Sequence, residues 1–198
     1  KNRKGLTNVW LRRGVFKKGS TKIPVDSIEH FHHVFRPGDS IASSVEELNF
    51  NTPVTDVNPI LLAESSELMD SSLVRTRLGI PPGAISVYIQ LGAGKINDIE
   101  TQLEMAIRVL NEYENAHIVI GESIIGDRLT LEGSRMRIIR DYPNSIFFNG
   151  FDFSIMAGGY NSYHEAIAFQ LPTLFIPNIN TGMDDQLARC KVAEREGW

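Results

Sequence analysis

The stretch Phe153–Gln170 (FSIMAGGYNSYHEAIAFQ) constrains the fold of this chain more than any other segment. Its apolar run Phe153–Ala157 is typical of a buried strand, and the Gly158–Gly159 pair ends that strand. A helical pattern then opens at Asn161 or Ser162. A strand, a tight glycine turn and a helix start together place unpaired backbone N–H groups at the end of a sheet. Since a helix N-terminus also carries partial positive charge, this arrangement predicts an anion site.

Ser162 and Glu165 have the S-x-x-E spacing of a capping box, which predicts that the helix begins at Ser162. A capping box is also a purely structural device that needs no ligand. The residues that follow predict a second strand at Pro172–Pro177, a polar loop, and a second helix starting at Asp184–Gln186. In an open parallel sheet, ligands bind at the carboxyl ends of the strands. Two acidic residues and an amide are therefore expected near the glycine turn.

The composition of the 198 residues is that of an ordinary globular protein, with 42% hydrophobic and 22% charged residues. A net charge of −4 argues against a nucleic-acid-binding surface. No apolar run approaches the ~20 residues of a membrane-spanning helix. The one cysteine, Cys190, excludes an internal disulfide framework and favours a reducing compartment, so a cytoplasmic location is expected.

The first 60 residues are poor in helical periodicity and are expected to form a separate layer with a linker near residues 56–62. Short strands are predicted at Asn8–Arg13 and His33–Arg36, and an extended segment at Val54–Ile60. The chain starts without methionine and stops at Gly197–Trp198, where a further strand would be expected. These ends favour a fragment whose second domain, residues 61–198, is truncated.

From Glu64 onward, helical and strand patterns alternate. The order strand, helix, strand predicts a parallel sheet with right-handed crossovers, so the expected fold class is α/β with a doubly wound sheet. Arg135–Ile139 alternates arginine with apolar residues and is expected nearer an edge. Asn144–Phe151 is ambiguous between a short helix and a strand. The other expected elements are helices at Ser66–Leu78 and Asn97–Tyr113 and strands at Ser86–Leu91 and Ile118–Gly121.

A second glycine turn, Gly92–Lys95, follows a predicted strand and precedes a predicted helix, so its backbone can approach a phosphate. It is not a P-loop, because no glycine stands five residues before Gly94 and Ile96 replaces the serine or threonine. It is not the dinucleotide fingerprint either, because Asn97 stands where the third glycine belongs. A simple tight turn is the structural alternative.

Two other possible reaction centres are not supported by the sequence. His30, His32 and His33 lack an acidic or cysteine partner at ligand spacing, and alternating strand residues point to opposite faces, so no metal site is expected. There is no Gly-x-Ser-x-Gly elbow, and Cys190 lies within a predicted helix without a feature that activates it.

The C-terminal residues resemble a known family. Gly158–Ser162, then Glu165, Leu171–Pro172 and Asp185–Gln186 are similar to the donor-binding signature of GT-B glycosyltransferases. Plant UDP-glycosyltransferases have a matching run, and the bacterial enzyme that adds N-acetylglucosamine to lipid-linked muramyl-peptide has a looser one. The plant signature departs at Ala157, where it has a histidine. Its Trp-x-Pro-Gln element has no clear counterpart, although Tyr142–Pro143 lies near the right distance.

The resemblance implies a role for each matching position. It implies that a glutamate accepts hydrogen bonds from the ribose and that an acid and an amide bind the donor sugar. It also implies a Rossmann-like C-terminal half of a GT-B fold, with residues 1–60 as the tail of the N-terminal, acceptor-binding domain. The implied diphosphate residues are Gly158, Gly159, Asn161, Ser162, Gly92 and Gly94, the ribose residue is Glu165, and the sugar residues are Asp185 and Gln186.

The implied activity is metal-independent transfer of a hexose from a UDP- or dTDP-linked sugar to an unknown small-molecule or lipid-linked acceptor. No other cofactor is implied, and peripheral membrane association is compatible with this reading. The catalytic base is unknown and is expected in the N-terminal domain, so this chain alone is expected to bind the donor without transferring it. Two alternatives remain open: a GT-B-fold nucleotide-sugar epimerase or hydrolase, and a non-catalytic nucleotide-binding half that works with a partner subunit.

Overall fold

The computed structural model describes residues 5–13, 28, 30–41, 51–92, 99–123, 133–182 and 184–198. The chain divides into two compact units. Unit 1 consists of Lys1–Ile60 with Gly182–Asp185, and unit 2 consists of Leu61–Thr181 with Gln186–Trp198.

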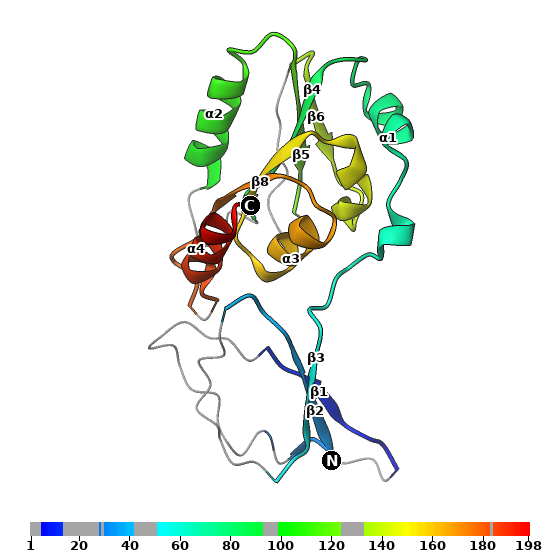
Figure 1. Ribbon diagram of the computed structural model, residues 1–198, viewed down its shortest axis with the longest axis vertical. Helices are drawn as coiled ribbons and strands as arrows, with labels where there is room; N and C mark the ends of the chain where they lie inside the picture. Colours follow the sequence, from blue (N-terminus) through cyan, green and yellow to red (C-terminus); the bar gives the residue numbers. More distant parts are fainter. Residues whose placement is uncertain are drawn as a thin grey trace. The chain divides into compact units, whose positions relative to one another are not determined.

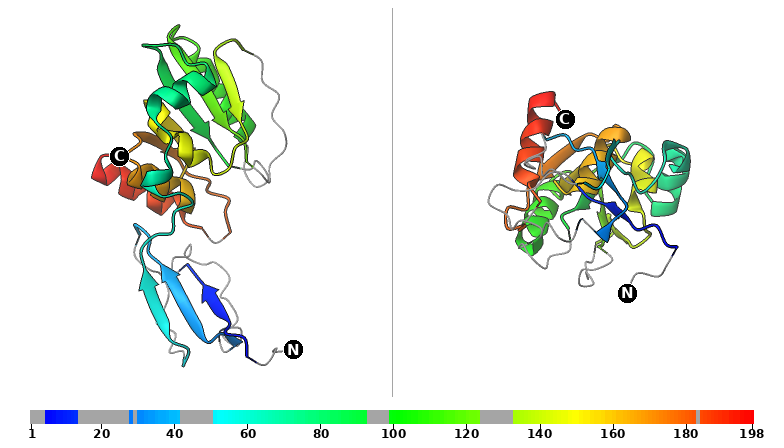
Figure 2. Two further views of the ribbon diagram at one scale, coloured as in Figure 1. Left: turned by 90° about the vertical axis from the view of Figure 1, so that its right-hand side faces the viewer. Right: turned by 90° about the horizontal axis from the view of Figure 1, so that it is seen from below.

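Among its described residues, unit 1 contains a three-stranded parallel sheet in the order β1-β2-β3. The strands are β1 (Val9–Leu11), β2 (His33–Pro37) and β3 (Val54–Val57), labelled in Figure 1 and seen as adjacent arrows in the left view of Figure 2. All three lie where the sequence predicts extended structure. Val34 in the central strand is buried, and the Trp10 and Phe31 rings stack with their centroids 5.0 Å apart.

Unit 2 is built on a five-stranded sheet in the order β6-β5-β4-β7-β8, in which every neighbouring pair is parallel. From the central strand β4 the chain moves outward to β5 and β6, then returns to the other side of β4 with β7 and β8. This confirms the predicted doubly wound α/β class, and β6 is the edge strand that its alternating arginines predict. The strands are β4 (Ile85–Gln90), β5 (Ala116–Gly121), β6 (Met136–Ile139), β7 (Phe153–Ala157) and β8 (Thr173–Ile176).

Both faces of this sheet are covered, which is why its central strands are almost entirely apolar. On one face, Tyr88 and Met156 pack with residues of α1 (Ser71–Leu78), η3 (Asn144–Gly150) and α3 (Tyr160–Ala168). On the other, Val87 and Ile155 pack with α2 (Ile99–Leu110). Figure 1 shows α1 and α2 on opposite sides of the strands. The last helix, α4 (Gln186–Glu196), follows β8.

The segment from Ser66 to Leu78 corrects one expectation, because it is not a single helix. A short 3-10 turn, η2 (Ser65–Glu67), is separate from α1. Asp70 stands between them and caps α1, accepting hydrogen bonds from the backbone N–H groups of Ser72 (2.9 Å) and Leu73 (3.3 Å). A capping aspartate has non-helical backbone angles, so a helix cannot run through it. The predicted end is confirmed, since Gly79 is left-handed with φ 68°.

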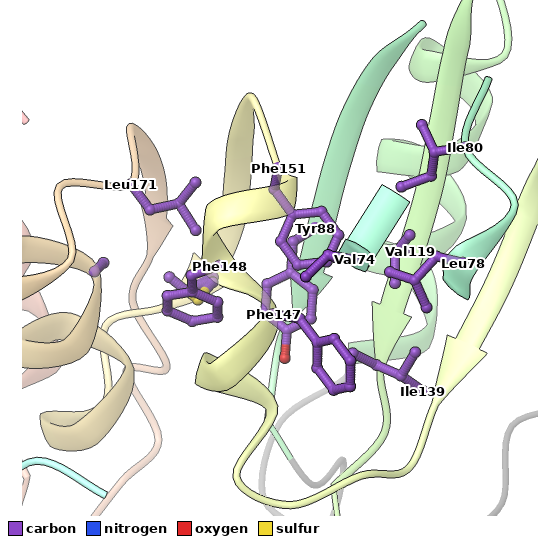
Figure 3. Close-up of a cluster of buried hydrophobic side chains, with 12 residues drawn as sticks. Val74, Leu78, Ile80, Tyr88, Val119, Ile139, Phe147, Phe148, Phe151 and Leu171 are labelled. Carbon is purple, nitrogen blue, oxygen red and sulfur yellow. The ribbon is translucent and has the colours of Figure 1, made fainter. Parts of the chain in front are cut away.

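The segment that is ambiguous in the sequence, Asn144–Phe151, forms the 3-10 helix η3 and supplies aromatic side chains to the core. Figure 3 shows Tyr88 of β4 surrounded by Phe147, Phe148 and Phe151. The Tyr88 ring stacks on Phe151 with centroids 5.1 Å apart and is tilted against Phe148 at 5.4 Å. This packing anchors η3 beside the sheet. The expected helix start at Asn97 lies outside the described residues, within which α2 runs from Ile99 to Leu110.

Near the amino end of β4, the buried Ser86 joins neighbouring segments by hydrogen bonds. Its hydroxyl donates to the carbonyl of Gly150 (2.8 Å), contacts Asp152 Oδ2 at 2.9 Å and accepts from Arg75 Nη1 at 3.0 Å. Its backbone N–H also donates to Asp152 Oδ2 (2.7 Å). Burial alone would raise the pKa of Asp152, but the Ser86 hydrogen bonds and the Arg75 charge outweigh it and hold that pKa below its ordinary value.

Ser86→Ala is therefore expected to lower the free energy of unfolding by about 1–3 kcal/mol, because buried polar groups lose their hydrogen-bond partner. Since the folded-state pKa of Asp152 is depressed, its stabilisation is present at neutral pH and is lost as the pH falls through that pKa. The variant should consequently lose less stability than the parent between pH 7 and pH 3. Urea unfolding at both pH values measures this, with exposed Ser71→Ala as the control. An unchanged pH dependence would contradict the role of Ser86.

Candidate functional site

The carboxyl ends of β4 and β7 mark the point where the strand order of unit 2 reverses. β4 pairs with β5 on one side and with β7 on the other, and the connections leaving β4 and β7 run in opposite directions along the sheet. In open α/β sheets this reversal leaves a crevice beyond the strand ends where ligands bind. The two glycine turns that the sequence singles out, at Gly92 and at Gly158–Gly159, follow these two strands.

The turn after β7 is held by the backbone of Gly158. Its N–H donates to the carbonyl of Ile176 on β8 (3.2 Å), and its carbonyl accepts a hydrogen bond from Arg189 Nη1 of α4 (2.6 Å). A Cβ at this position would lie 2.5 Å from Cys190 Sγ, closer than real Cβ atoms come. Glycine is required here by the close approach of α4.

The start of α3 corrects the predicted capping box. Gly159 is the N-cap, the helix begins at Tyr160, and no side chain caps it. Ser162 and Glu165 are therefore not a capping pair, because Ser162 already lies in the first turn. The first helical hydrogen bond runs from the Tyr163 N–H to the Gly159 carbonyl, at 2.9 Å. The N–H groups of Asn161 and Ser162, which precede Tyr163, therefore have no acceptor within the helix. These N–H groups donate to no described residue.

Glu165 lies in α3 and is buried, with 6% of its surface exposed. Its Oε1 accepts two hydrogen bonds, from the backbone N–H of Leu62 (3.1 Å) and from the hydroxyl of Ser145 (3.0 Å). Burial raises the pKa of Glu165 above its ordinary value, and these two hydrogen bonds oppose the rise without cancelling it. The carboxylate is thus held between the start of unit 2 and η3.

A polar cluster that the sequence does not single out lies beside Glu165. Tyr88 donates its hydroxyl hydrogen bond to Gln90 Oε1 (3.1 Å) and also hydrogen-bonds the Asn144 side chain. Burial is the main reason that the pKa of Tyr88 is raised, and the charge of Glu165 adds to it. The cluster fits only because Gly121 has no side chain, since a Cβ there would meet the Tyr88 hydroxyl at 2.0 Å. Asn144 Oδ1 is buried and accepts no hydrogen bond from the described residues.

The loop after β8 joins both glycine turns to α4. Asn178 donates from its side chain to the carbonyl of Leu91, next to Gly92 (3.3 Å), and from its backbone N–H to Gln186 Oε1 (3.0 Å). Gln186 is buried, and its Nε2 lies 4.0 Å from where a Cβ of Gly159 would stand. The structure thus brings together Gly92, Gly158–Gly159 and Gln186.

Gly92, Gly94 and Asp185 complete the predicted positions. Gly92 has φ 101°, a backbone conformation that favours glycine, whereas Gly94 lies outside the described residues. Asp185 is half-buried and directly precedes α4, and its role stays a prediction.

Arg189 is a further residue near the candidate site that the sequence does not single out. It is fully buried, donates to the Gly158 carbonyl, and its guanidinium lies 5.9 Å from the centroid of the Tyr160 ring. Arg189 thus fixes the glycine turn from α4. Within the sequence, Arg189 is one of many arginines in helical context, and only its packing distinguishes it.

The histidines of unit 1 take part in hydrogen bonds of the small sheet. His32 Nδ1 accepts from the backbone N–H of Asn8 (2.9 Å), and His33 Nε2 lies 2.9 Å from the Thr55 hydroxyl. Across the described ranges, no group of three histidine, cysteine, aspartate or glutamate side chains is close enough to hold a metal ion. The helices of the described part of the chain are all too short or too polar to cross a membrane.

No protein-family model matches the chain, and no curated protein matches it. Among solved structures, the chain is similar to the spinosyn forosaminyltransferase SpnP, with 15% sequence identity and a TM-score of 0.49. The aligned region covers 84% of this chain and 40% of SpnP, so the chain spans well under half the length of that protein.

Proposed function

We propose that unit 2 is the nucleotide-sugar-binding half of a metal-independent GT-B glycosyltransferase, which uses a UDP- or dTDP-linked hexose as donor. The observation that carries the proposal is the position of the Gly158–Ser162 turn, which follows β7 directly at the strand-order reversal. A turn with unpaired N–H groups at this point of a doubly wound sheet suits the diphosphate of a nucleotide.

The diphosphate is assigned to the glycine turn and the first turn of α3. The N–H groups of Asn161 and Ser162 donate to no described residue, and Arg189 adds positive charge behind Gly158. Glycosyl transfer builds negative charge on the leaving diphosphate. Fixed N–H donors, the helix dipole and a buried guanidinium stabilise that charge without a metal ion.

The ribose is assigned to Glu165. Both of its hydrogen bonds end on Oε1, so Oε2 accepts none from the described residues. Oε2 is also not fully buried, so it retains contact with solvent. An open carboxylate oxygen suits the hydroxyl groups of a ribose, to which it offers charge-assisted hydrogen bonds.

The donor sugar is assigned to Gln186, the first residue of α4, and the role of the preceding Asp185 stays a prediction from the sequence. The Gln186 side chain is fixed through Oε1, and its Nε2 donates to no described residue, which leaves it as a donor for a sugar hydroxyl. No residue is assigned as the catalytic base. The acceptor, small-molecule or lipid-linked, stays unassigned as well.

Calorimetry with uridine diphosphate and thymidine diphosphate tests the proposal. At least one is expected to bind the parent chain, with the same affinity in the presence of a chelator. Glu165→Gln keeps an Oε1 acceptor for Leu62 and Ser145 but replaces Oε2 with an amide donor. Because hydrogen bonds to charged groups contribute about 1.5–3 kcal/mol, affinity should fall about 10- to 100-fold.

The fold of Glu165→Gln is expected to survive. Because the folded-state pKa of Glu165 is raised, its titration stabilises the fold below its unfolded-state pKa, and this contribution is lost as the pH rises through the folded-state value. The free energy of unfolding of the variant, relative to that of the parent, should therefore be most favourable at high pH. Tight diphosphate binding by Glu165→Gln would exclude the ribose role, and binding that needs a divalent ion would exclude the metal-free mechanism.

A further inference from the structure

The Ser145 hydroxyl lies at the start of η3, where it is positioned by the aromatic residues that follow it. Ser145 is 2% exposed, and the next residues, including Phe147 and Phe148, are packed into the core around Tyr88. Its hydroxyl donates to Glu165 Oε1 at 3.0 Å, across a separation of 20 residues. A serine held this firmly provides a fixed donor.

The carboxylate of Glu165 is consequently asymmetric. The Leu62 N–H is a second donor to the same oxygen, at 3.1 Å. Two donors on Oε1 hold that oxygen in place and leave Oε2 without a donor among the described residues. Oε2 accepts no hydrogen bond from the described residues and retains contact with solvent.

The charge state of Glu165 depends on the same two donors. Burial raises its pKa, and the hydrogen bonds from Ser145 and Leu62 are the influences that lower it. Tyr88, from β4, is the titratable group that interacts electrostatically with Glu165, and it adds no positive charge. No cation among the described residues shifts the pKa of Glu165. Losing the Ser145 hydroxyl should therefore favour the protonated, uncharged acid.

We propose that Ser145 is a positioning residue for ligand binding, which acts by holding Oε1 of Glu165 so that Oε2 accepts a hydroxyl hydrogen of a bound nucleoside diphosphate. This inference rests on the proposed function, since it assigns a task to the same site. Ser145 itself does not touch the ligand.

Ser145→Ala tests the proposal. Its affinity for uridine diphosphate at pH 7 is expected to fall about 3- to 10-fold, the size of one lost hydrogen bond. Its affinity for inorganic pyrophosphate, which has no ribose, should stay the same. The pH below which uridine diphosphate binding is lost should move upward, because Glu165 then protonates more readily. Ser145→Thr, which restores a hydroxyl, should recover the parent pH profile.

Ser154→Ala is the matched control. Ser154 is also buried, with its hydroxyl 2.7 Å from that of Thr173, and the hydrogen bonds of Glu165 go to Leu62 and Ser145 instead. It loses a similar hydrogen bond and should leave the pH profile of binding unchanged. A carboxyl-carbon NMR titration of Glu165 gives a readout without ligand and should show a higher pKa in Ser145→Ala than in the parent.

The possible outcomes distinguish the role of Ser145 from the proposed function of the site. If the parent binds uridine diphosphate and Ser145→Ala shows the parent pH profile and the parent Glu165 titration, the positioning role is wrong and the proposed function stands. Equal loss of uridine diphosphate and pyrophosphate affinity would also overturn the positioning role, since it would indicate a general structural effect. If the parent binds neither uridine nor thymidine diphosphate, the proposed function and this inference both fail.

Discussion

Replacing Gly158 with alanine is expected to lower the free energy of unfolding by about 1–3 kcal/mol, the cost of an overpacked buried site. The added Cβ would lie 2.5 Å from Cys190 Sγ and 3.2 Å from the carbonyl oxygen of Gln186. The second contact is with backbone, which cannot turn away, so α4 has to shift. Because the strain displaces both the glycine turn and Gln186, diphosphate and nucleotide-sugar affinity should fall as well. Urea unfolding and calorimetry measure the two effects.

Two further variants make the steric reason testable. Gly182→Ala adds a Cβ with no atom within 4 Å and should have the stability of the parent. Cys190→Ala removes the sulfur, so Gly158→Ala combined with Cys190→Ala should recover part of the lost stability. Recovery should be incomplete, because the Gln186 carbonyl stays in place. If Gly158→Ala is as stable as the parent, the close approach of α4 to the turn is wrong.

Arg189→Met is expected to weaken diphosphate binding about 10- to 30-fold and to lower stability by about 1–3 kcal/mol. The stability loss follows because the buried Gly158 carbonyl loses its donor at 2.6 Å. The binding loss follows from charge: two unit charges about 8 Å apart interact by about 2 kcal/mol at an effective dielectric constant of ~20. Uridine carries no phosphate, so its affinity should hardly change.

Arg195→Met is the control on the same helix. Its side chain is 71% exposed and pairs with Glu196 at 3.3 Å, and surface pairs of this kind contribute little. It should leave both stability and binding near the parent values. A similar loss of affinity for uridine and for uridine diphosphate in Arg189→Met would show that Arg189 acts through the fold alone. Unchanged diphosphate affinity would exclude its electrostatic role.

The sequence by itself determined the class of fold and the position of the glycine turn after β7. Alternating strand and helix patterns predict a parallel, doubly wound sheet because each pattern is local and is repeated several times. The glycine pair after β7 predicts a backbone turn at a strand end for the same reason. Ser66–Leu78 is the exception, since the sequence does not distinguish Asp70 as a cap from Asp70 as a surface residue of a longer helix.

Only the tertiary structure decided what the side chains of the site do. Ser162 and Glu165 match a capping box locally, but the backbone of Gly159 caps α3 and Glu165 turns to partners elsewhere. Its partner Leu62 is 103 residues away, and Arg189 lies 31 residues from the Gly158 carbonyl that it contacts. A hydrogen bond across such separations depends on how the layers pack, and no spacing rule within one segment encodes it. The backbone turn was therefore predictable from the sequence, whereas the side chains that support it became apparent only when the sheet, η3 and α4 were seen together.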